Sequence, residues 1–179
     1  MKKIFIFLLL AVVAVGCKCE ETLTVFNLTE EEKALIPYQL HQSVNWVDNN
    51  NITHNGSVIT ITEDYDVGDN GPEECGVVKY NRLNSYLQFN NFKYLISISK
   101  DYSISFGIHE LVNDKSTKYF TGNPKDFKTI EFNGETYDNA ILLKESVLDD
   151  EPYGHIVYSK TNGIEFILFE DGSWYKRIE

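Results

Sequence analysis

Alternating apolar and polar side chains mark two neighbouring strands near the middle of the chain. Residues 94–99 (YLISIS) and 102–108 (YSISFGI) place apolar side chains at every second position. A period of two residues is typical of a β-strand with one buried face. A three-residue connection keeps the apolar side chains of both segments on one face, with Ser97 and Ser103 on the other. The pairs predicted in this way are Ile98 with Tyr102, Ile96 with Ile104, and Tyr94 with Phe106.

Three pairs of residues that favour tight turns predict further hairpins. Asn133-Gly134, Asn162-Gly163 and Asp171-Gly172 are preferred in two-residue type I′ turns. Cross-strand aromatic pairs and opposite charges contribute about 0.2–1 kcal/mol each. The pairs predicted from two-residue turns are Ile130 with Tyr137, Lys160 with Glu165, Tyr158 with Ile167, Val157 with Leu168, and Phe169 with Trp174.

The rest of the chain predicts more strands and one helix. Thr29 and Glu32 form the capping box of a helix over residues 29–36, which Pro37 ends. Strands are expected at 22–27, 43–48, 57–64, 77–89 and 115–120. The connections are short and lack βαβ spacing. We therefore predict an all-β fold: an antiparallel meander that forms a sandwich or barrel, with one short N-terminal helix.

The first residues have the layout of a signal for export. Lys2 and Lys3 precede an apolar run over residues 4–15. Such an order is typical of a secretory signal peptide. A transmembrane helix needs about 20 apolar residues, and this run is shorter.

The end of this run, Ala14-Val15-Gly16-Cys17, resembles the lipobox of bacterial lipoproteins. The resemblance covers only the N-terminus and implies cleavage before Cys17 and attachment of lipid to its thiol. An ordinary secreted protein, cut by the general signal peptidase, is the alternative. The chain is thus divided into a signal peptide (1–16), a lipidated tether (17–24) and a single β-rich globular domain (25–179).

The resemblance also implies where the protein is located. It places the domain in the bacterial cell envelope, attached to a membrane through the N-terminal lipid. Lys18 follows the cysteine where an Asp would be linked to inner-membrane retention. The resemblance therefore favours the outer membrane or the cell surface.

Acidity limits the classes of partner. The 179 residues have a formal net charge of −11, which becomes −13 when residues 1–16 are removed, because two lysines and no acidic residues are lost. This charge disfavours nucleic acid and anionic lipid as partners. It is compatible with a soluble acidic surface or with attraction to a basic protein.

Two cysteines remain if Cys17 carries lipid. An exported compartment permits disulfides, and a bridge between Cys19 and Cys75 would close a long loop. In the chain-entropy model, such a bridge would raise the free energy of unfolding by about 4 kcal/mol. Free thiols or a link to another chain are the alternatives.

Motifs for catalysis, metal binding or cofactor binding are not found in the sequence. His41, His54, His109 and His155 lack metal-binding spacing, and no nucleophile elbow or phosphate-binding glycine loop occurs. The acidic residues 63–74 lack the ordered ligand pattern of a calcium loop, so we expect a solvated loop between strands. Trp46 is the aromatic residue least constrained by pairing and is the candidate for an exposed ligand-binding side chain. We predict no cofactor, no metal and no enzymatic activity.

Three hypotheses of function follow from these features. The first is a membrane-anchored lipoprotein that is a non-enzymatic binding or structural module, with a protein or glycan ligand. The second is an acidic inhibitor or immunity-type protein that binds a basic enzyme or toxin. The third is a hydrolase with an unrecognised pair of carboxylates.

Overall fold

A computed structural model describes residues 22–69, 76–145 and 154–178, which form twelve strands and two short helical turns. The helical turns are α2 (Glu30–Lys33) and the 3-10 turn η1 (Pro124–Asp126). The strands are β1 (Thr22–Phe26), β2 (Ser43–Asp48), β3 (Thr53–Asp69), β4 (Gly76–Phe89), β5 (Phe92–Lys100), β6 (Ile104–Val112), β7 (Lys115–Gly122), β8 (Lys128–Phe132), β9 (Glu135–Glu145), β10 (His155–Ser159), β11 (Gly163–Leu168) and β12 (Trp174–Ile178).

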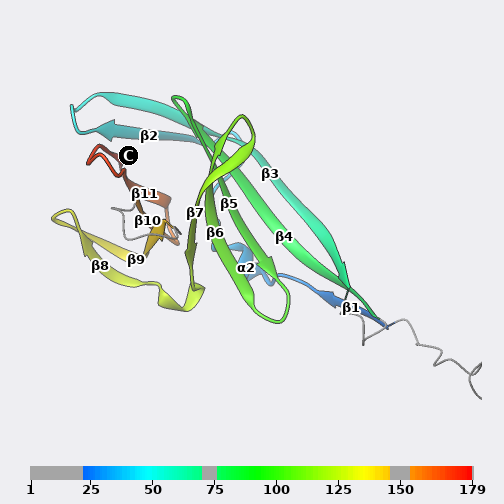
Figure 1. Cartoon of the computed structure of the whole chain (residues 1–179). Coiled ribbons are helices and arrows are strands. Elements are labelled where there is room, and N and C mark those ends of the chain that lie inside the picture. Colours follow the sequence, from blue (N-terminus) through cyan, green and yellow to red (C-terminus); the bar gives the residue numbers. More distant parts are fainter. Residues whose placement is uncertain (1–21, 70–75, 146–153, 179) are drawn as a thin grey trace, which may run out of the picture.

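Ten of the strands close into an antiparallel barrel (Figure 1). Their order around the ring is β4-β3-β2-β12-β11-β10-β9-β7-β6-β5, with β5 paired back to β4, and the pairing of β12 with β2 joins the last strand of the meander to the first. Outside the ring, β1 pairs with β4 in parallel and β8 pairs with β9. The predicted all-β antiparallel fold is confirmed, and of the two architectures left open by the sequence the barrel is the one formed.

The barrel interior is filled by side chains. Alternate residues from strands all around the ring form one buried cluster, which includes Trp46, Phe89, Ile96, Ile108 and Tyr158. Small barrels are commonly filled in this way, since inward and outward positions alternate along each strand. A second, smaller cluster, made by Tyr137, Ala140, Val157 and Phe166, lies outside the first.

The segment between β1 and β2 packs against the interior cluster. The predicted capping box is present: the Thr29 amide donates to Glu32 Oε2 at 2.7 Å, and the Glu32 amide donates to Thr29 Oγ1 at 3.2 Å. The helix ends at Lys33, three residues earlier than predicted. Leu35 follows it and is buried, and its carbonyl accepts a 2.8 Å hydrogen bond from the Tyr158 hydroxyl.

The Asn133-Gly134 turn forms as predicted. Phe132 pairs with Glu135 across the two-residue loop, and Ile130 pairs with Tyr137. Both turn residues have positive φ, at 51° and 80°. Positive φ at both central positions is what a type I′ turn requires.

The two other Asx-Gly turns have loops one residue longer than predicted. Gly163 has positive φ and pairs with Ser159 across a three-residue loop, as in a glycine bulge. At the second turn, the Phe169 amide donates to the carbonyl of Ser173. The added residue shifts both registers. Four predicted pairs are therefore wrong: Lys160 with Glu165, Tyr158 with Ile167, Val157 with Leu168, and Phe169 with Trp174. The pairs formed are Tyr158 with Ile164, Val157 with Phe166, and Leu168 with Trp174.

The β5–β6 hairpin has a loop of the predicted length at a different place. The loop is residues 101–103, where the Asp101 carboxylate accepts the Ser103 amide at 2.8 Å. The predicted partners of Tyr94, Ile96 and Ile98 are therefore wrong, although the faces are right. The pairs formed are Ile98 with Phe106, Ile96 with Ile108, and Tyr94 with Glu110.

Candidate functional site

The structure does not place Trp46 where a ligand could reach it. Trp46 is completely buried in β2, and its ring stacks on that of Phe89 with centroids 4.9 Å apart. The prediction of an exposed Trp46 is wrong, because Trp46 shares the inward face of β2 with Val44. Cys17, Cys19 and Cys75 lie outside the described residues, as does the end of the acidic segment 63–74. Residues 63–69 of that segment belong to β3 rather than to a loop, and β1 begins at Thr22, within the predicted tether.

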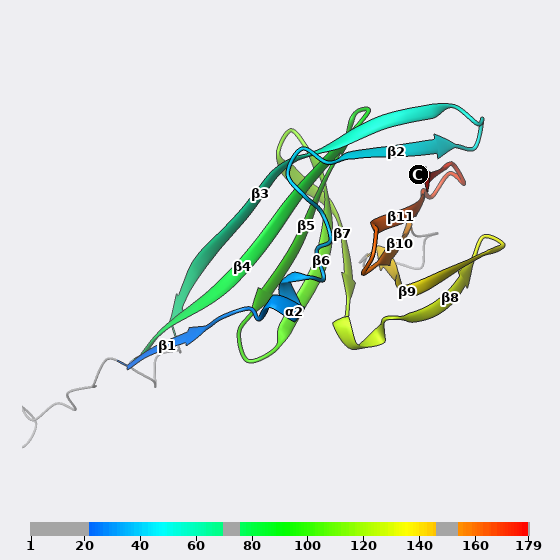
Figure 2. The same ribbon diagram turned by 180° about the vertical axis from the view of Figure 1, so that it is seen from behind.

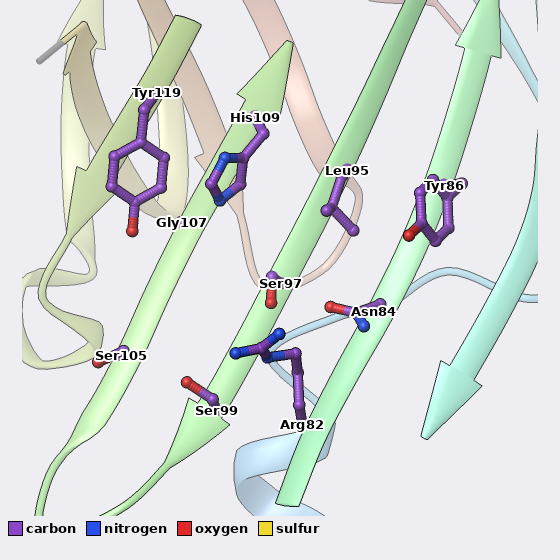
Figure 3. A pocket seen from close by; sticks show the side chains of 10 residues that line it. All are labelled: Arg82, Asn84, Tyr86, Leu95, Ser97, Ser99, Ser105, Gly107, His109 and Tyr119. Atoms are coloured by element: carbon purple, nitrogen blue, oxygen red, sulfur yellow. The ribbon is translucent and has the colours of Figure 1, made fainter. Parts of the chain in front are cut away.

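A shallow groove of about 390 Å³ lies on the outer face of β4, β5, β6 and β7 (Figure 3). Its centre is lined by small side chains, because Ser97 pairs with Gly107 and Ser99 pairs with Ser105 on neighbouring strands. Larger side chains stand around this centre, namely Arg82, Asn84, Tyr86, Leu95, His109 and Tyr119. The groove is thus made by small residues at consecutive outward positions.

One margin of the groove is a pair of rings in contact, with their planes tilted by 31°. His109 in β6 pairs with Tyr119 in β7, and their ring centroids are 4.2 Å apart. A Cβ atom on Gly107 would be 2.7 Å from a carbon of the Tyr119 ring, so the ring lies across the glycine. His109 Nδ1 is 3.0 Å from Ser116 Oγ, which holds the imidazole in place. Glycine at position 107 therefore allows Tyr119 to lie over the strand.

The opposite margin carries a guanidinium and an amide. Arg82 forms a 2.5 Å ion pair with Asp66 of β3. Figure 3 shows its guanidinium directed toward Ser97 and Ser99. Asn84 Oδ1 is shielded from solvent and has no hydrogen-bond partner within the described part of the chain. This margin can therefore offer guanidinium and amide hydrogen-bond donors, whereas the shielded Asn84 Oδ1 is not accessible to a ligand.

The groove differs in charge from the chain as a whole. None of the ten described residues that line it carries a carboxylate, although the net charge of the chain is −11. Burial, together with the positive charge of Arg82, lowers the pKa of His109 and keeps this imidazole neutral at pH 7. The groove is therefore suited to neutral or anionic groups that hydrogen-bond and pack on tyrosine rings.

A second polar cluster is formed by side chains of β6, β7 and β9 and by Glu170. Lys118 Nζ is 3.3 Å from Glu145 and 2.5 Å from Glu170. Tyr94 donates a 3.3 Å hydrogen bond to Glu110, and burial raises the pKa of this glutamate. Glu110 and Glu145 do not line the groove of Figure 3. The hydrolase carboxylate pair therefore stays a prediction, without a substrate cleft assigned to it.

His54 forms a third polar contact, with Asp48 and Asn90. Its Nε2 atom is 3.0 Å from Asp48 Oδ2, and its Nδ1 atom faces the Asn90 amide. Over residues 22–69, 76–145 and 154–178, no three His, Cys, Asp or Glu side chains are grouped so that they could hold a metal ion. Within the same ranges, no helix is long and apolar enough to cross a membrane.

Sequence analysis did not identify the groove, although part of the signal was present. Ser97 and Ser99 alternate with isoleucines in β5, and Ser105 and Gly107 alternate with large apolar residues in β6. Small residues at consecutive outward positions of two paired strands indicate a concave surface. The contributions of Arg82 and Tyr119 depend on the neighbouring strands and on side-chain directions. Comparison of the chain with known protein families, with curated proteins and with solved structures finds no match.

Proposed function

We propose that this protein is a lipid-anchored, non-enzymatic binding protein of the bacterial cell envelope, and that the groove on β4–β7 binds a saccharide. One observation carries the proposal: the hydroxyls of Ser97, Ser99 and Ser105 form the floor of a groove beside the Tyr119 ring, on an otherwise acidic protein. The lipobox-like residues ending at Cys17 support the anchor, and they favour the outer membrane or cell surface as its location.

The chemistry of the groove matches that of sugars. Serine hydroxyls both donate and accept hydrogen bonds, as sugar hydroxyls do, and the Asn84 amide nitrogen can donate. Tyr119, which is 37% exposed, offers a flat apolar ring for the C–H face of a sugar, whereas the Lys93 ammonium lies over the Tyr86 ring, 5.3 Å from its centroid. Arg82 has guanidinium donors beyond those facing Asp66, and a carboxylate can accept from them. The ligand that fits best is a neutral or uronic-acid-containing saccharide.

Titration calorimetry with the purified mature protein tests this proposal. The probes are tetrasaccharides of neutral hexoses and of uronic acids. Replacement of Tyr119 by Ala should weaken binding about fivefold, since loss of one aromatic contact costs on the order of 1 kcal/mol. Tyr102→Ala is the matched control, because Tyr102 is exposed in the β5–β6 loop and does not line the groove. Absence of binding to every probe, or equal losses in both variants, would contradict a saccharide site.

Calorimetry with a basic protein at low and high salt, and an assay of the tetrasaccharides for new reducing ends, separate the other two hypotheses. Association with a basic protein that weakens sharply with salt and is unaffected by Tyr119→Ala would favour the acidic inhibitor. Release of new reducing ends from the tetrasaccharides would favour the hydrolase.

Mass spectrometry of the mature N-terminus tests the anchor. The expected species begins at Cys17 and carries the mass of the attached lipid. An unmodified Cys17, or an N-terminus elsewhere, would contradict the lipoprotein assignment and leave the groove to be tested alone.

A further inference from the structure

Three strand segments extend beyond the ring of the barrel as a ribbon. β3 pairs with β2 only through residues 53–57, and β4 pairs with β5 only through residues 82–89. Residues 65–69 therefore pair with residues 77–81, and β1 pairs along the other edge of β4 with residues 76–80. Figures 1 and 2 show β1 and the adjoining ends of β3 and β4 projecting from one end of the molecule. We call residues 22–26, 65–69 and 76–81 the ribbon.

One face of the ribbon carries four exposed apolar side chains together with Lys79. Val67 lies opposite Lys79, and Lys79 lies opposite Val25, so these three side chains share a face. Alternation along the strands adds Leu23 and Tyr65 to it. The side chains of Leu23, Val25, Tyr65 and Val67 are exposed, with 44–62% of their surface accessible. Apolar side chains gathered on one exposed face indicate an interaction surface.

The position of this face relative to Cys17 points to its partner. Thr22, the first residue of β1, is five residues after Cys17. A fully extended chain of that length spans at most roughly 18 Å. A lipid on Cys17 would thus hold the ribbon beside the surface of the bilayer. The other strands follow later in the chain and are held there less directly.

We propose that the apolar face of the ribbon rests in the interfacial region of the bilayer and holds the barrel in one orientation. This inference rests on the proposed lipid anchor. Lys79 is compatible with the headgroup region, and the acidic chain as a whole favours zwitterionic over anionic lipid. Alternation along β4 places Lys79 and Arg82 on opposite faces, so the saccharide groove begins on the side turned away from the membrane.

A second copy of the chain is a poorer occupant of this face. Stable interfaces bury about 20–30 residues on each side, whereas the exposed apolar set here has four members. Contact with a bilayer does not require so large an interface when the protein is already tethered, because the attached lipid supplies most of the membrane affinity. The ribbon then contributes orientation rather than attachment.

Fluorescent labelling of the lipidated full protein in phosphatidylcholine vesicles tests the inference. The label is attached at Val67→Cys, and the matched control is Val112→Cys, an exposed valine in the distant β6–β7 hairpin. Cys19 and Cys75 are replaced by Ser in both variants. Spin-labelled lipids should quench the Val67→Cys label at least about threefold more than the control, because interfacial groups lie about 5–10 Å into the headgroup region.

The outcomes separate failure of the ribbon from failure of the anchor. The labelled protein is first weighed by mass spectrometry to verify that lipid is attached. A lipidated protein with equal, weak quenching at both positions would overturn the ribbon contact and leave the anchor and the groove intact. A protein without lipid would overturn the anchor itself.

A second matched pair protects the test against a variant that fails to fold. Leu23→Cys is compared with Ile52→Cys, an exposed aliphatic residue beside the β2–β3 turn, away from the ribbon (Figure 1). Stronger quenching at position 23 supports the contact. Unlabelled protein is then added to the labelled Leu23→Cys variant. If the two self-associate and quenching at position 23 is lost, a second copy is the occupant of this face and the membrane contact is overturned.

Discussion

The two faces of β5 and β6 belong to the same hairpin and carry opposite kinds of side chain. Ile96, Ile98 and Ile108 face the interior and are completely buried. On the outer face Ser97, Ser99 and Ser105 line the hollow of the groove, and the Tyr119 ring lies over Gly107. The comparison shows that a strand can be closely packed on one side and hollow on the other. Stability should therefore depend mainly on the inner face and ligand binding on the outer face.

Truncation on the inner face should have the largest effect on stability. Ile96→Ala removes buried methyl and methylene groups and leaves a cavity, so the free energy of unfolding should fall by about 3 kcal/mol. Urea unfolding followed by circular dichroism measures this loss. The folded fraction should keep its saccharide affinity. A stability equal to that of the unaltered protein would contradict the conclusion that stability depends mainly on the inner face.

Addition of one methyl group at the centre of the groove should have a smaller effect on stability and a clear one on binding. In Gly107→Ala the new Cβ would be 2.7 Å from the Tyr119 ring, so the ring must move. We expect a loss of about 1 kcal/mol in the free energy of unfolding, together with weaker saccharide binding. Gly68→Ala is the control, since its Cβ would lie 3.7 Å from Tyr80 in ordinary contact. Unchanged saccharide binding by the position-107 variant would argue against the groove.

The margin of the groove should make stability sensitive to mild acid. Burial and Arg82 lower the pKa of His109 in the folded state below its unfolded value of about 6.5. The unfolded state then binds the proton more readily, so this contribution is complete above about pH 6.5 and is lost as the pH falls through the lowered value.

Unfolding measured from pH 7.5 to pH 5 in the unaltered protein and in His109→Gln isolates this contribution. The variant should show the flatter profile. Glu110 works in the opposite direction, because burial raises its pKa and its protonation in acid favours the folded state. Identical profiles in the two proteins would show that His109 is not the group responsible.

Removal of the groove's guanidinium should change stability least. The ion pair of Arg82 with Asp66 is partly exposed, and such pairs contribute roughly 0–1 kcal/mol. Arg82→Gln should nevertheless weaken binding of the uronic-acid tetrasaccharide more than that of the neutral one. Calorimetry of both probes, with Lys115→Gln as an exposed cation outside the groove, measures the difference. Equal losses for both probes would remove the role of Arg82 in recognising carboxylates.

Turn residues located the hairpins but did not determine their loop lengths. The three glycines of the Asx-Gly pairs all have positive φ, as their turn chemistry requires, yet only Asn133-Gly134 forms a two-residue turn. At Gly163 the next residue, Ile164, donates its amide to the hydroxyl of Tyr38, which is 126 residues away. A local sequence window does not contain Tyr38, so the bulge was not predictable from it.

Trp46 illustrates the same limit for the candidate site. Its alternation with Val44 and Asp48 is visible in the sequence, but the face of β2 that points inward depends on the neighbouring strands. Those neighbours are β3 and β12, and β12 lies at the other end of the chain. Burial of Trp46 therefore followed from a pairing that no local pattern indicates.

The sequence by itself determined the strands, the capped helix and the sides of β5 and β6 that face the interior. These features depend on side-chain alternation and on hydrogen bonds between residues a few positions apart. Only the tertiary structure decided that the meander closes through β2 and β12, and that Arg82 and Tyr119 stand across Ser97 and Gly107 from each other. The physical reason is that closure and groove shape depend on contacts between residues remote in sequence, which no local side-chain pattern encodes.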